Sequence, residues 1–334
     1  MTARKQPDVS RSLRANEKRL RALLDERAAL VSRKTRGRSP RTFPRETAEM
    51  LLREVRAATR ALESPLSVAY MGPPSSFSHQ AAMKHFGSAP LFHAKDSIAD
   101  VFRSVVRGET GYGVVPVENT IEGAVTYTLD MLVDTPVQIC NEVRLEIHMN
   151  LMSTAAAGDI TTIYSIPIAF AQCRNWLSKH FPHARQADVY STARAAELAA
   201  QEPNAAAVAS ELAAKLYGLN IIGRAIEDHL NNTTRFFVIG LHAAPPSEHD
   251  KTSIVFAIKD RVGALYDALR PFRSARINLS KIESRPMKQK AWEYYFFVDL
   301  VGHASRPDVR RALDELQKHC TFVKILGSYP QCER

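Results

Sequence analysis

Short apolar segments alternate with helix-forming segments over residues 66–217, and this alternation constrains the fold more than any other feature of the sequence. Each apolar segment is short enough for a single strand, and each is followed by a polar turn and then by a helical pattern. The strands predicted in this way lie at residues 66–70, 112–117, 163–164, 189–190 and 206–209. This order is typical of an α/β domain, which we expect to occupy residues 65–242.

A second order of elements follows the proline-bearing linker at residues 242–250. It predicts a half-buried strand over 252–258, a helix over 261–272, strands over 277–284 and 292–301, a helix over 307–319 and a strand over 322–328. The order β-α-β-β-α-β is that of a ferredoxin-like module. We therefore expect a separate C-terminal domain over residues 251–330.

The N-terminal segment, residues 1–64, predicts two helices. One covers residues 11–33, where leucine and valine side chains recur on one stripe. The other begins at Pro44, since proline is favoured in the first turn of a helix. Two such helices cannot bury their apolar stripes alone, so we expect them to pack on another chain or on the rest of the molecule.

Positive charge is concentrated in the same segment. Residues 1–60 hold 17 Lys and Arg against 7 Asp and Glu, which accounts for the whole net charge of +10. A nucleic-acid-binding arm would interleave aromatic side chains with its basic ones, and Phe43 is the single aromatic residue here. We interpret the charge as a solvated or partner-facing helix surface and expect no nucleic-acid partner.

Composition argues against several other classes of protein. No apolar run is long enough to span a bilayer, and the N-terminus leads into a charged helix instead of an apolar signal core. We therefore expect a cytoplasmic protein with no membrane partner. The four cysteines are widely spaced and the eleven histidines lack paired ligand spacing, so we expect neither a disulfide framework nor a metal site.

A hydroxyl and a guanidinium lie side by side just before an apolar strand, at Thr234 and Arg235. The hydroxyl can donate a hydrogen bond to a leaving oxygen, and the guanidinium can hold a carboxylate bidentately. Taken alone, the pair fits a polar turn that enters an edge strand better than it fits an active site.

Hydroxyl residues also begin several predicted helices, where free backbone N–H groups favour an anion. They are Ser76, Ser78, Thr120, Ser191 and Thr192. Each alone is an ordinary N-cap, but with Glu118, Asn119, Glu122, Thr234 and Arg235 they would suit a small dianion. The sequence has no Walker lysine, GxGxxG motif or nucleophile elbow. We expect no cofactor and a reaction that needs only electrostatic positioning and one proton donor.

Several ordered motifs over residues 66–240 resemble those of prephenate dehydratase domains. The matching stretches lie at residues 70–82, 115–125, 128–130, 171–174, 191–193 and 232–236. Residues 252–330 resemble the ACT regulatory domain of those enzymes, through the motifs at 263–265 and 283–286. The resemblance implies an α/β fold with a two-lobed, periplasmic-binding-protein-like dehydratase domain and a ferredoxin-like (βαββαβ) ACT domain, preceded by an α-helical segment.

The same resemblance implies decarboxylative dehydration of prephenate to phenylpyruvate in L-phenylalanine biosynthesis. Thr234 would donate to the departing hydroxyl, while Arg235 and Phe236 would place the carboxylate and the ring. The residues implied at the substrate are Ser76, Phe77, Asn119, Thr120, Glu122, Ser191 and Thr192.

The sequence departs from the family pattern in three places. Ser75 stands where glycine is common, Thr120 replaces the usual serine, and Ile166 and Ile168 break the usual Ser-His-Pro-Gln run. These departures leave open an arogenate dehydratase or a specialised cyclohexadienol dehydratase. A non-catalytic amino-acid sensor is a further alternative.

In the ACT-like segment the resemblance implies an L-phenylalanine site at an interface between modules. Its residues would be Gly263, Ala264, Leu265, Asn278, Leu279, Glu283, Ser284 and Arg285. Gly263 would let the ligand approach a helix N-terminus closely, although a tight turn would also explain it. Glu283 and Arg285 would otherwise form an exposed ion pair. We expect a homodimer or homotetramer.

Residues 1–64 resemble a shortened chorismate mutase domain, in which Arg27, Arg45 and Glu46 match active-site positions. The chain reaches Leu66 before the further long helix that the mutase family carries. Mutase chemistry also needs several cations around a dianionic ether. We expect weak or absent mutase activity and an assembly role for the segment, with a bifunctional enzyme as the alternative.

Overall fold

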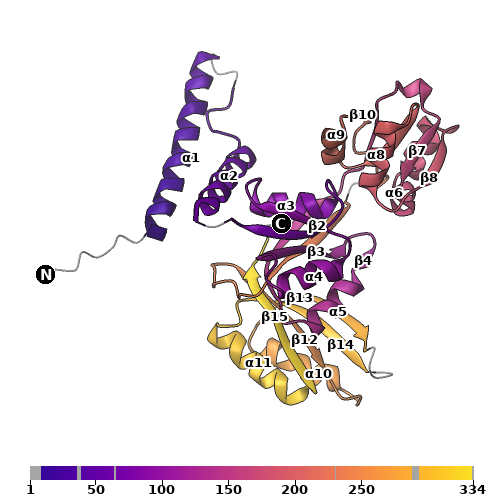
Figure 1. Cartoon of the computed structure of the whole chain (residues 1–334). Coiled ribbons are helices and arrows are strands. Elements are labelled where there is room, and N and C mark those ends of the chain that lie inside the picture. The colour runs from indigo at the N-terminus through magenta and orange to yellow at the C-terminus, as the bar shows by residue number, and fades with distance from the viewer. Residues whose placement is uncertain (1–8, 36–38, 64, 230, 288–292, 333–334) are drawn as a thin grey trace. The chain divides into compact units, whose positions relative to one another are not determined.

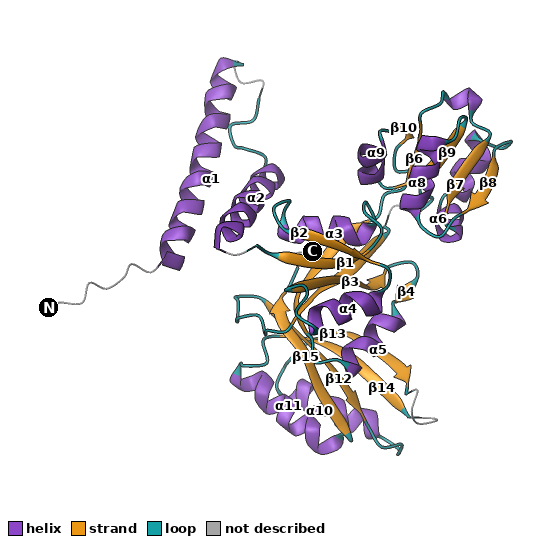
Figure 2. Cartoon of the chain, in the orientation of Figure 1, coloured by secondary structure: helices purple, strands orange, loops and turns teal. Residues whose placement is uncertain are grey.

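The computed structural model describes residues 9–35, 39–63, 65–229, 231–287 and 293–332 (Figure 1). The chain divides into two compact units. One consists of Met1–Leu66 with His85–Pro90, and the other of Ser67–Lys84 with Leu91–Arg334. The helices and strands are distinguished by colour in Figure 2.

The smaller unit contains the two expected N-terminal helices, α1 (Val9–Lys34) and α2 (Arg45–Glu63). An ion pair joins them, with Arg56 Nε 2.7 Å from Glu17 Oε1. The apolar stripes are only partly covered. Large side chains that stay exposed are Leu13, Leu23, Leu30, Val31, Met50, Leu51, Val55 and Leu62.

The larger unit begins with a mixed sheet, the first sheet, in the order β2-β1-β3-β11-β5, with β4 paired to β3. Strands β1, β2 and β3 are parallel, whereas β11 runs antiparallel to both β3 and β5. The strands are β1 (Ser67–Met71), β2 (Leu91–Lys95), β3 (Tyr112–Asn119), β4 (Gly123–Ala124), β5 (Gln138–Glu146) and β11 (Thr233–Gly240). The helices of this lobe are α3 (Phe77–Phe86), α4 (Ile98–Val106) and α5 (Thr126–Asp134).

The second sheet forms a second lobe, which the chain inserts between the neighbouring strands β5 and β11. Its order is β10-β6-β9-β7-β8. The strands are β6 (Asn150–Ser153), β7 (Thr162–Ser165), β8 (Arg185–Asp188), β9 (Ala205–Ala209) and β10 (Asn220–Gly223). The helices are η1 (Ala157–Asp159), α6 (Pro167–Gln172), α7 (Arg174–His180), α8 (Thr192–Gln201) and α9 (Glu211–Tyr217). This two-lobed α/β arrangement confirms the expected fold.

Two local predictions in the second lobe are wrong. The helical pattern that follows the strand predicted at residues 163–164 forms two short helices, which break at Cys173, where the backbone leaves the helical region. The strand expected at residues 189–190 ends earlier, at Asp188, because Tyr190 is 82% exposed and belongs to the loop before α8.

The third sheet is antiparallel, in the order β13-β14-β12-β15, and it carries two helices. Its elements are β12 (Asp250–Ala257), α10 (Ala264–Ser274), β13 (Leu279–Pro286), β14 (Tyr294–Val301), α11 (Pro307–His319) and β15 (Phe322–Pro330). This is the expected ferredoxin-like module. The expected start of β14 at Trp292 lies outside the described residues.

Strand β12 is buried at every position, which corrects the expectation of a half-buried strand. Ile254 and Phe256 pack in the cluster that includes helices α10 and α11, while Val255 belongs to the cluster of the first sheet. Both faces of the third sheet are therefore covered.

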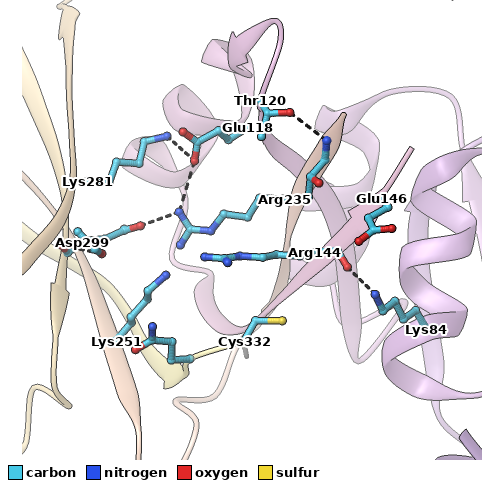
Figure 3. A pocket seen from close by; sticks show the side chains of 13 residues that line it. Lys84, Glu118, Thr120, Arg144, Glu146, Arg235, Lys251, Lys281, Asp299 and Cys332 are labelled. Carbon is cyan, nitrogen blue, oxygen red and sulfur yellow. Dashed lines mark hydrogen bonds and ion pairs between the residues drawn. The ribbon is translucent and has the colours of Figure 1, made fainter. Parts of the chain in front are cut away.

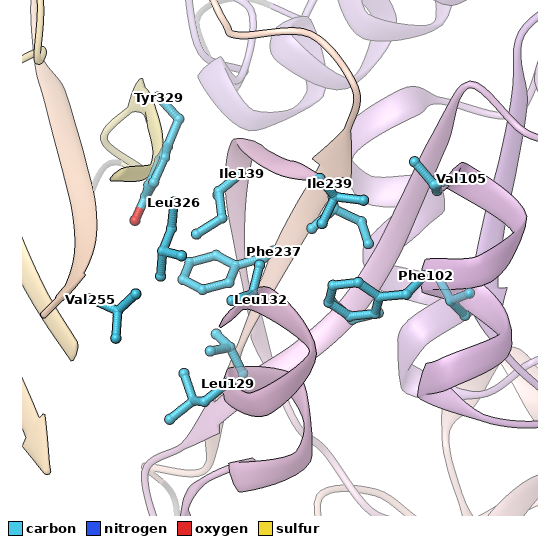
Figure 4. Packing of buried hydrophobic residues seen from close by; sticks show 14 of the residues in the cluster. Phe102, Val105, Leu129, Leu132, Ile139, Phe237, Ile239, Val255, Leu326 and Tyr329 are labelled. Atoms are coloured by element: carbon cyan, nitrogen blue, oxygen red, sulfur yellow. The ribbon is translucent and has the colours of Figure 1, made fainter. Parts of the chain in front are cut away.

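The first and third sheets share one hydrophobic core (Figure 4). The Tyr329 ring packs edge-on to Phe237, with centroids 5.9 Å apart. A Cβ on Gly327 would lie 2.2 Å from the carbonyl oxygen of Ile139, so this close approach requires glycine. Lys324 adds polar contacts by donating to three carbonyls at the end of α5, the nearest at 2.6 Å.

Candidate active site

Thr234 lies at the start of β11, where its half-buried hydroxyl meets the end of β3. The register places Thr234 opposite Asn119, and Asn119 Nδ2 donates to Thr234 Oγ1 at 2.8 Å. Asn119 Oδ1 accepts from the backbone N–H groups of Ile121 and Glu122, at 2.8 and 3.1 Å. These bonds fix the orientation of the amide. The threonine oxygen is therefore an acceptor toward Asn119, and its own proton is left to donate elsewhere.

A chain of side-chain amides extends from Asn119 to the second lobe. Asn119 Nδ2 also donates to Asn232 Oδ1 at 2.8 Å, and Asn232 Nδ2 donates to Gln172 Oε1 at 3.1 Å. Gln172 Nε2 then donates to Glu122 Oε1 at 3.3 Å. Asn232 and Gln172 are buried, so these bonds hold residues of both lobes in one arrangement.

The sequence-based site omitted Gln172 and Asn232. Both residues stand inside the matched motif stretches, at 171–174 and 232–236. A buried amide needs partners both for its N–H donors and for its oxygen. Amide side chains inside the motif stretches were therefore the sequence signal from which Gln172 and Asn232 could have been found.

Glu122 closes the amide chain at its other end. The residue is exposed overall, but partial burial of its carboxyl group raises its pKa. The protonated form of this carboxyl is consequently favoured to higher pH than in water.

Ser75 and Ser76 form the turn before α3 with their hydroxyls used in different ways. Ser76 Oγ donates to the carbonyl of Met71 at 2.8 Å and accepts from the backbone of His79 at 3.3 Å, so it caps the helix. Ser75 has a φ of 68°, a left-handed conformation that favours glycine. Its buried Oγ has no hydrogen-bond partner, while its carbonyl accepts from Ser210 Oγ of the second lobe at 3.1 Å.

Four other residues expected at the substrate pack against, cap or fasten neighbouring parts of the protein. Phe77 packs against the core of the second lobe. Thr120 Oγ1 donates to the carbonyl of Asn231 and accepts from the backbone of Thr233, so it fastens the start of β11. Ser191 is an N-cap that accepts from the backbone of Arg194, and Thr192 is buried in the first turn of α8. Of the expected set, hydrogen bonds bring together Thr234, Asn119 and Glu122.

Arg235 lies on the opposite face of β11 from Thr234, because successive side chains alternate along a strand. Its guanidinium donates to Glu142, Asp299 and Tyr329 at 2.7, 2.6 and 2.9 Å. Burial alone would lower the pKa of Arg235, but Tyr329, Asp299 and Glu142 together raise it. These bonds turn the guanidinium away from Thr234, and the expectation that Arg235 places a substrate carboxylate stays a prediction.

Phe236 returns to the Thr234 face of the strand, and its side chain is buried.

A second candidate site lies on the third sheet. A cavity of about 450 Å³ is lined by Gly263, Ala264 and Leu265 together with Tyr294 and Phe296. Gly263 has a φ of 77° and begins α10, as the tight-turn interpretation requires.

The remaining residues expected at this second site lie elsewhere. Asn278, Leu279, Glu283, Ser284 and Arg285 are not among the residues that line the cavity. Arg285 forms a bidentate ion pair with Asp130 of α5, which replaces the alternative of an exposed ion pair with Glu283.

In the smaller unit, Arg27 of α1 and Arg45 and Glu46 of α2 are all exposed. Over the described residues, no group of three or more His, Cys, Asp or Glu could hold a metal ion. No helix in this same part of the chain is long and apolar enough to cross a membrane.

Comparison with known proteins gives consistent results. The prephenate dehydratase family model matches residues 68–244, and the ACT domain model matches residues 252–317. A bifunctional chorismate mutase/prephenate dehydratase of Aquifex aeolicus is 47% identical over 290 residues, which cover 86% of this chain and 80% of that protein.

Two solved structures are similar to most of the chain. The prephenate dehydratase of Arthrobacter aurescens, solved in complex with L-Phe, has a TM-score of 0.73 and 33% identity, covering 80% of this chain and 90% of that one. A structure described as GqqA, a quorum quenching acylase, has a TM-score of 0.73 and 28% identity, covering 80% of this chain and 98% of that one.

Proposed function

Because the chain belongs to the prephenate dehydratase family, we propose that it converts prephenate to phenylpyruvate, carbon dioxide and water. In this reaction the bond from C4 to the hydroxyl and the bond from C1 to the carboxylate both break. The electron pair of the second bond completes the aromatic ring, and the departing hydroxide takes up a proton. The observation that carries the proposal is the hydroxyl of Thr234, which Asn119 leaves free to donate.

In this mechanism Thr234 donates a hydrogen bond to the leaving oxygen as negative charge develops there. The amides of Asn232 and Gln172 hold the two lobes and Asn119 in place. Glu122 accepts from Gln172 Nε2 and anchors the far end of this amide chain.

Replacement of Thr234 tests this function. Thr234→Val should lower kcat by roughly 10²–10³-fold, the usual loss when one such donor is removed. Thr233→Val is the matched control, because its side chain points to the other face of the same strand. Phenylpyruvate formation from prephenate is the measurement. A Thr234→Val protein as active as Thr233→Val would contradict the proposal.

The substrate could differ from prephenate at its side-chain end. Ser75 supports this alternative, since it places a buried, unpartnered hydroxyl in the turn before α3 where the family commonly has glycine. Comparison of kcat/KM for prephenate and arogenate decides between them. A higher value for arogenate would assign the chain to the second reaction.

For regulation, the cavity at Gly263, Ala264 and Leu265 supports an L-phenylalanine site in the ACT domain. The neighbouring Val262 is 99% exposed, in keeping with a site that a second copy completes in a homodimer or homotetramer. Isothermal titration with L-phenylalanine and the mass of the assembly in solution test both statements. A Gly263→Leu variant that bound L-phenylalanine normally would contradict this location.

The N-terminal segment serves assembly in this proposal, and the protein acts in the cytoplasm. The exposed apolar side chains of α1 and α2 support this role, because an apolar surface of this kind is expected to be covered in the assembled protein. Chorismate turnover should be weak or absent, since Arg27, Arg45 and Glu46 are exposed. Rapid conversion of chorismate that Arg27→Ala abolishes would instead establish a bifunctional enzyme.

A further inference from the structure

We propose that Asp299 and Tyr329 of the ACT domain are positioning residues for the catalytic threonine, acting through Arg235. The inference, which rests on the proposed function, assigns the ACT sheet a direct part in the architecture of the dehydratase site. Neither residue touches the substrate; each acts on the strand that carries Thr234.

The contacts form one buried network on the far face of the first sheet, and Figure 3 shows the part in which Arg235 meets Asp299 and Glu118. Arg235 Nη1 lies 2.6 Å from Asp299 Oδ2, and Arg235 Nη2 donates to Tyr329 Oη at 2.9 Å. Ser253 Oγ donates to Asp299 Oδ1 at 2.5 Å and lies 2.6 Å from Tyr329 Oη, so it orients both groups. From the dehydratase side, Glu142 accepts from Arg235 Nε at 2.7 Å and faces Lys251 Nζ at 3.1 Å.

The backbone beside Thr234 needs such an anchor. The register between β11 and β3 shifts between Arg235 and Phe236, where the partner changes from Glu118 to Pro116. A bulge redirects nearby side chains, and proline supplies no N–H to the ladder. Pairing with β5 remains regular here, whereas pairing with β3 resumes only after Val117 is skipped. The side chain of Arg235 adds a restraint at this interruption of the β3 ladder.

A similar contact with the ACT domain holds β3, the strand that pairs with β11. Glu118 precedes Asn119 on β3, and its carboxylate lies 2.9 Å from Lys281 Nζ of the ACT domain and 3.7 Å from Arg235 Nη1. Thr234 and Asn119, which face each other in the site, thus each have a neighbour that reaches ACT side chains. The ACT sheet therefore fixes the distance between the two strands that form the Asn119–Thr234 hydrogen bond.

Tyr329→Phe in the full chain tests the inference, because it removes one hydroxyl and keeps the ring against Phe237. We expect kcat to fall by roughly 10–100-fold, the scale of effect that a misplacement of about 1 Å produces. KM for prephenate should change little, because the loss would fall on the transition state. Ser253→Ala, which removes the hydroxyl that orients Asp299, should lower kcat in the same way.

Thr252→Val is the matched control. Thr252 Oγ1 is also buried and donates to Gly302 O at 2.6 Å, but it lies on the other face of β12 from Ser253. A purely structural role predicts that all three variants lower the melting temperature and leave kcat unchanged. That result for folded Tyr329→Phe and Ser253→Ala would overturn the inference while leaving the dehydratase function intact. Absence of prephenate turnover by the wild-type chain would remove the proposed function and this inference together.

Discussion

At the scale of single residues, the direction of one amide decides what Thr234 can do. Asn119 Oδ1 is occupied by two backbone N–H groups, so its Nδ2 must face Thr234. A hydroxyl that accepts from an amide keeps its proton for another acceptor. The chemistry of the site therefore depends on a turn at the end of β3 as much as on the threonine.

Asn119→Asp tests this dependence with almost no change of shape. A carboxylate oxygen in place of Nδ2 would accept the proton of Thr234 and remove it from the leaving hydroxyl. We expect kcat to fall by roughly 10²–10³-fold and the melting temperature to fall as well, because the bond from Asn119 Nδ2 to the buried Asn232 Oδ1 is also lost. Turnover of prephenate at saturating concentration is the measurement, and wild-type kcat in a folded Asn119→Asp protein would contradict the assigned hydrogen-bond direction.

The direction of Arg235 could be inferred in part from sequence. Alternation along a strand predicts that Thr234 and Arg235 face opposite ways, so only one of them can point into a given cleft. Its partners could not be inferred, because Glu142, Asp299 and Tyr329 lie 93, 64 and 94 positions away. Local pattern carries no signal at such separations.

At the scale of elements, the chain crosses twice between the two lobes, after β5 and before β11. Glu227, on the returning segment, accepts from the backbone of Met149 at 2.9 Å, and His148 Nδ1 lies 2.8 Å from its other carboxylate oxygen. This contact joins the two crossing segments side by side. The hydrogen bond to Glu227 raises the pKa of His148 above its ordinary value of 6.5, although burial opposes the shift.

The His148–Glu227 contact predicts a pH-dependent stability. Because the folded-state pKa of His148 is raised, protonation favours the folded state; this stabilisation is full below pH 6.5 and is lost as the pH rises through the folded pKa. The melting temperature of wild type should therefore exceed that of His148→Gln by more at pH 5.5 than at pH 8.5. An equal difference at both pH values would show that protonated His148 does not stabilise the folded state at this crossing.

Elements with strong periodicity were predictable from sequence, and buried ones were less so. Helix α11 (Pro307–His319) matches its expected bounds, since its apolar positions recur at helical spacing. Strands β2 and β5 were not predicted individually. Strand β5 carries Glu142 amid its apolar residues, because this carboxylate meets Arg235 of β11 and Lys251 of the ACT sheet and not water.

At the scale of the whole molecule, the dehydratase and ACT domains are joined by a shared core. Residues of β12, β14 and β15 pack with those of β5 and β11 in one cluster. The sequence predicted two separate domains, since each has a complete order of elements. The shared core could not be read from it, because a strand covered on both faces differs from a half-buried one by only a few apolar residues.

Gly327→Ala tests this junction. The added Cβ would lie 2.2 Å from Ile139 O and would push β15 away from β5. We expect a loss of about 1–3 kcal/mol in the free energy of unfolding, as for other overpacked sites. Gly158→Ala, where a Cβ meets nothing within 4 Å, is the control and should be close to wild type. Equal stability of both variants in a denaturant titration would contradict the close packing of the two sheets.

The most direct test of the account is a crystal structure of the full chain with an unreactive analogue of prephenate that keeps the 4-hydroxyl. We expect this hydroxyl oxygen to lie within about 2.6–3.2 Å of Thr234 Oγ1, with Asn119 still donating to the same atom and Arg235 still bound to Asp299 and Tyr329. An analogue bound away from Thr234, or held through its carboxylate by the guanidinium of Arg235, would contradict it.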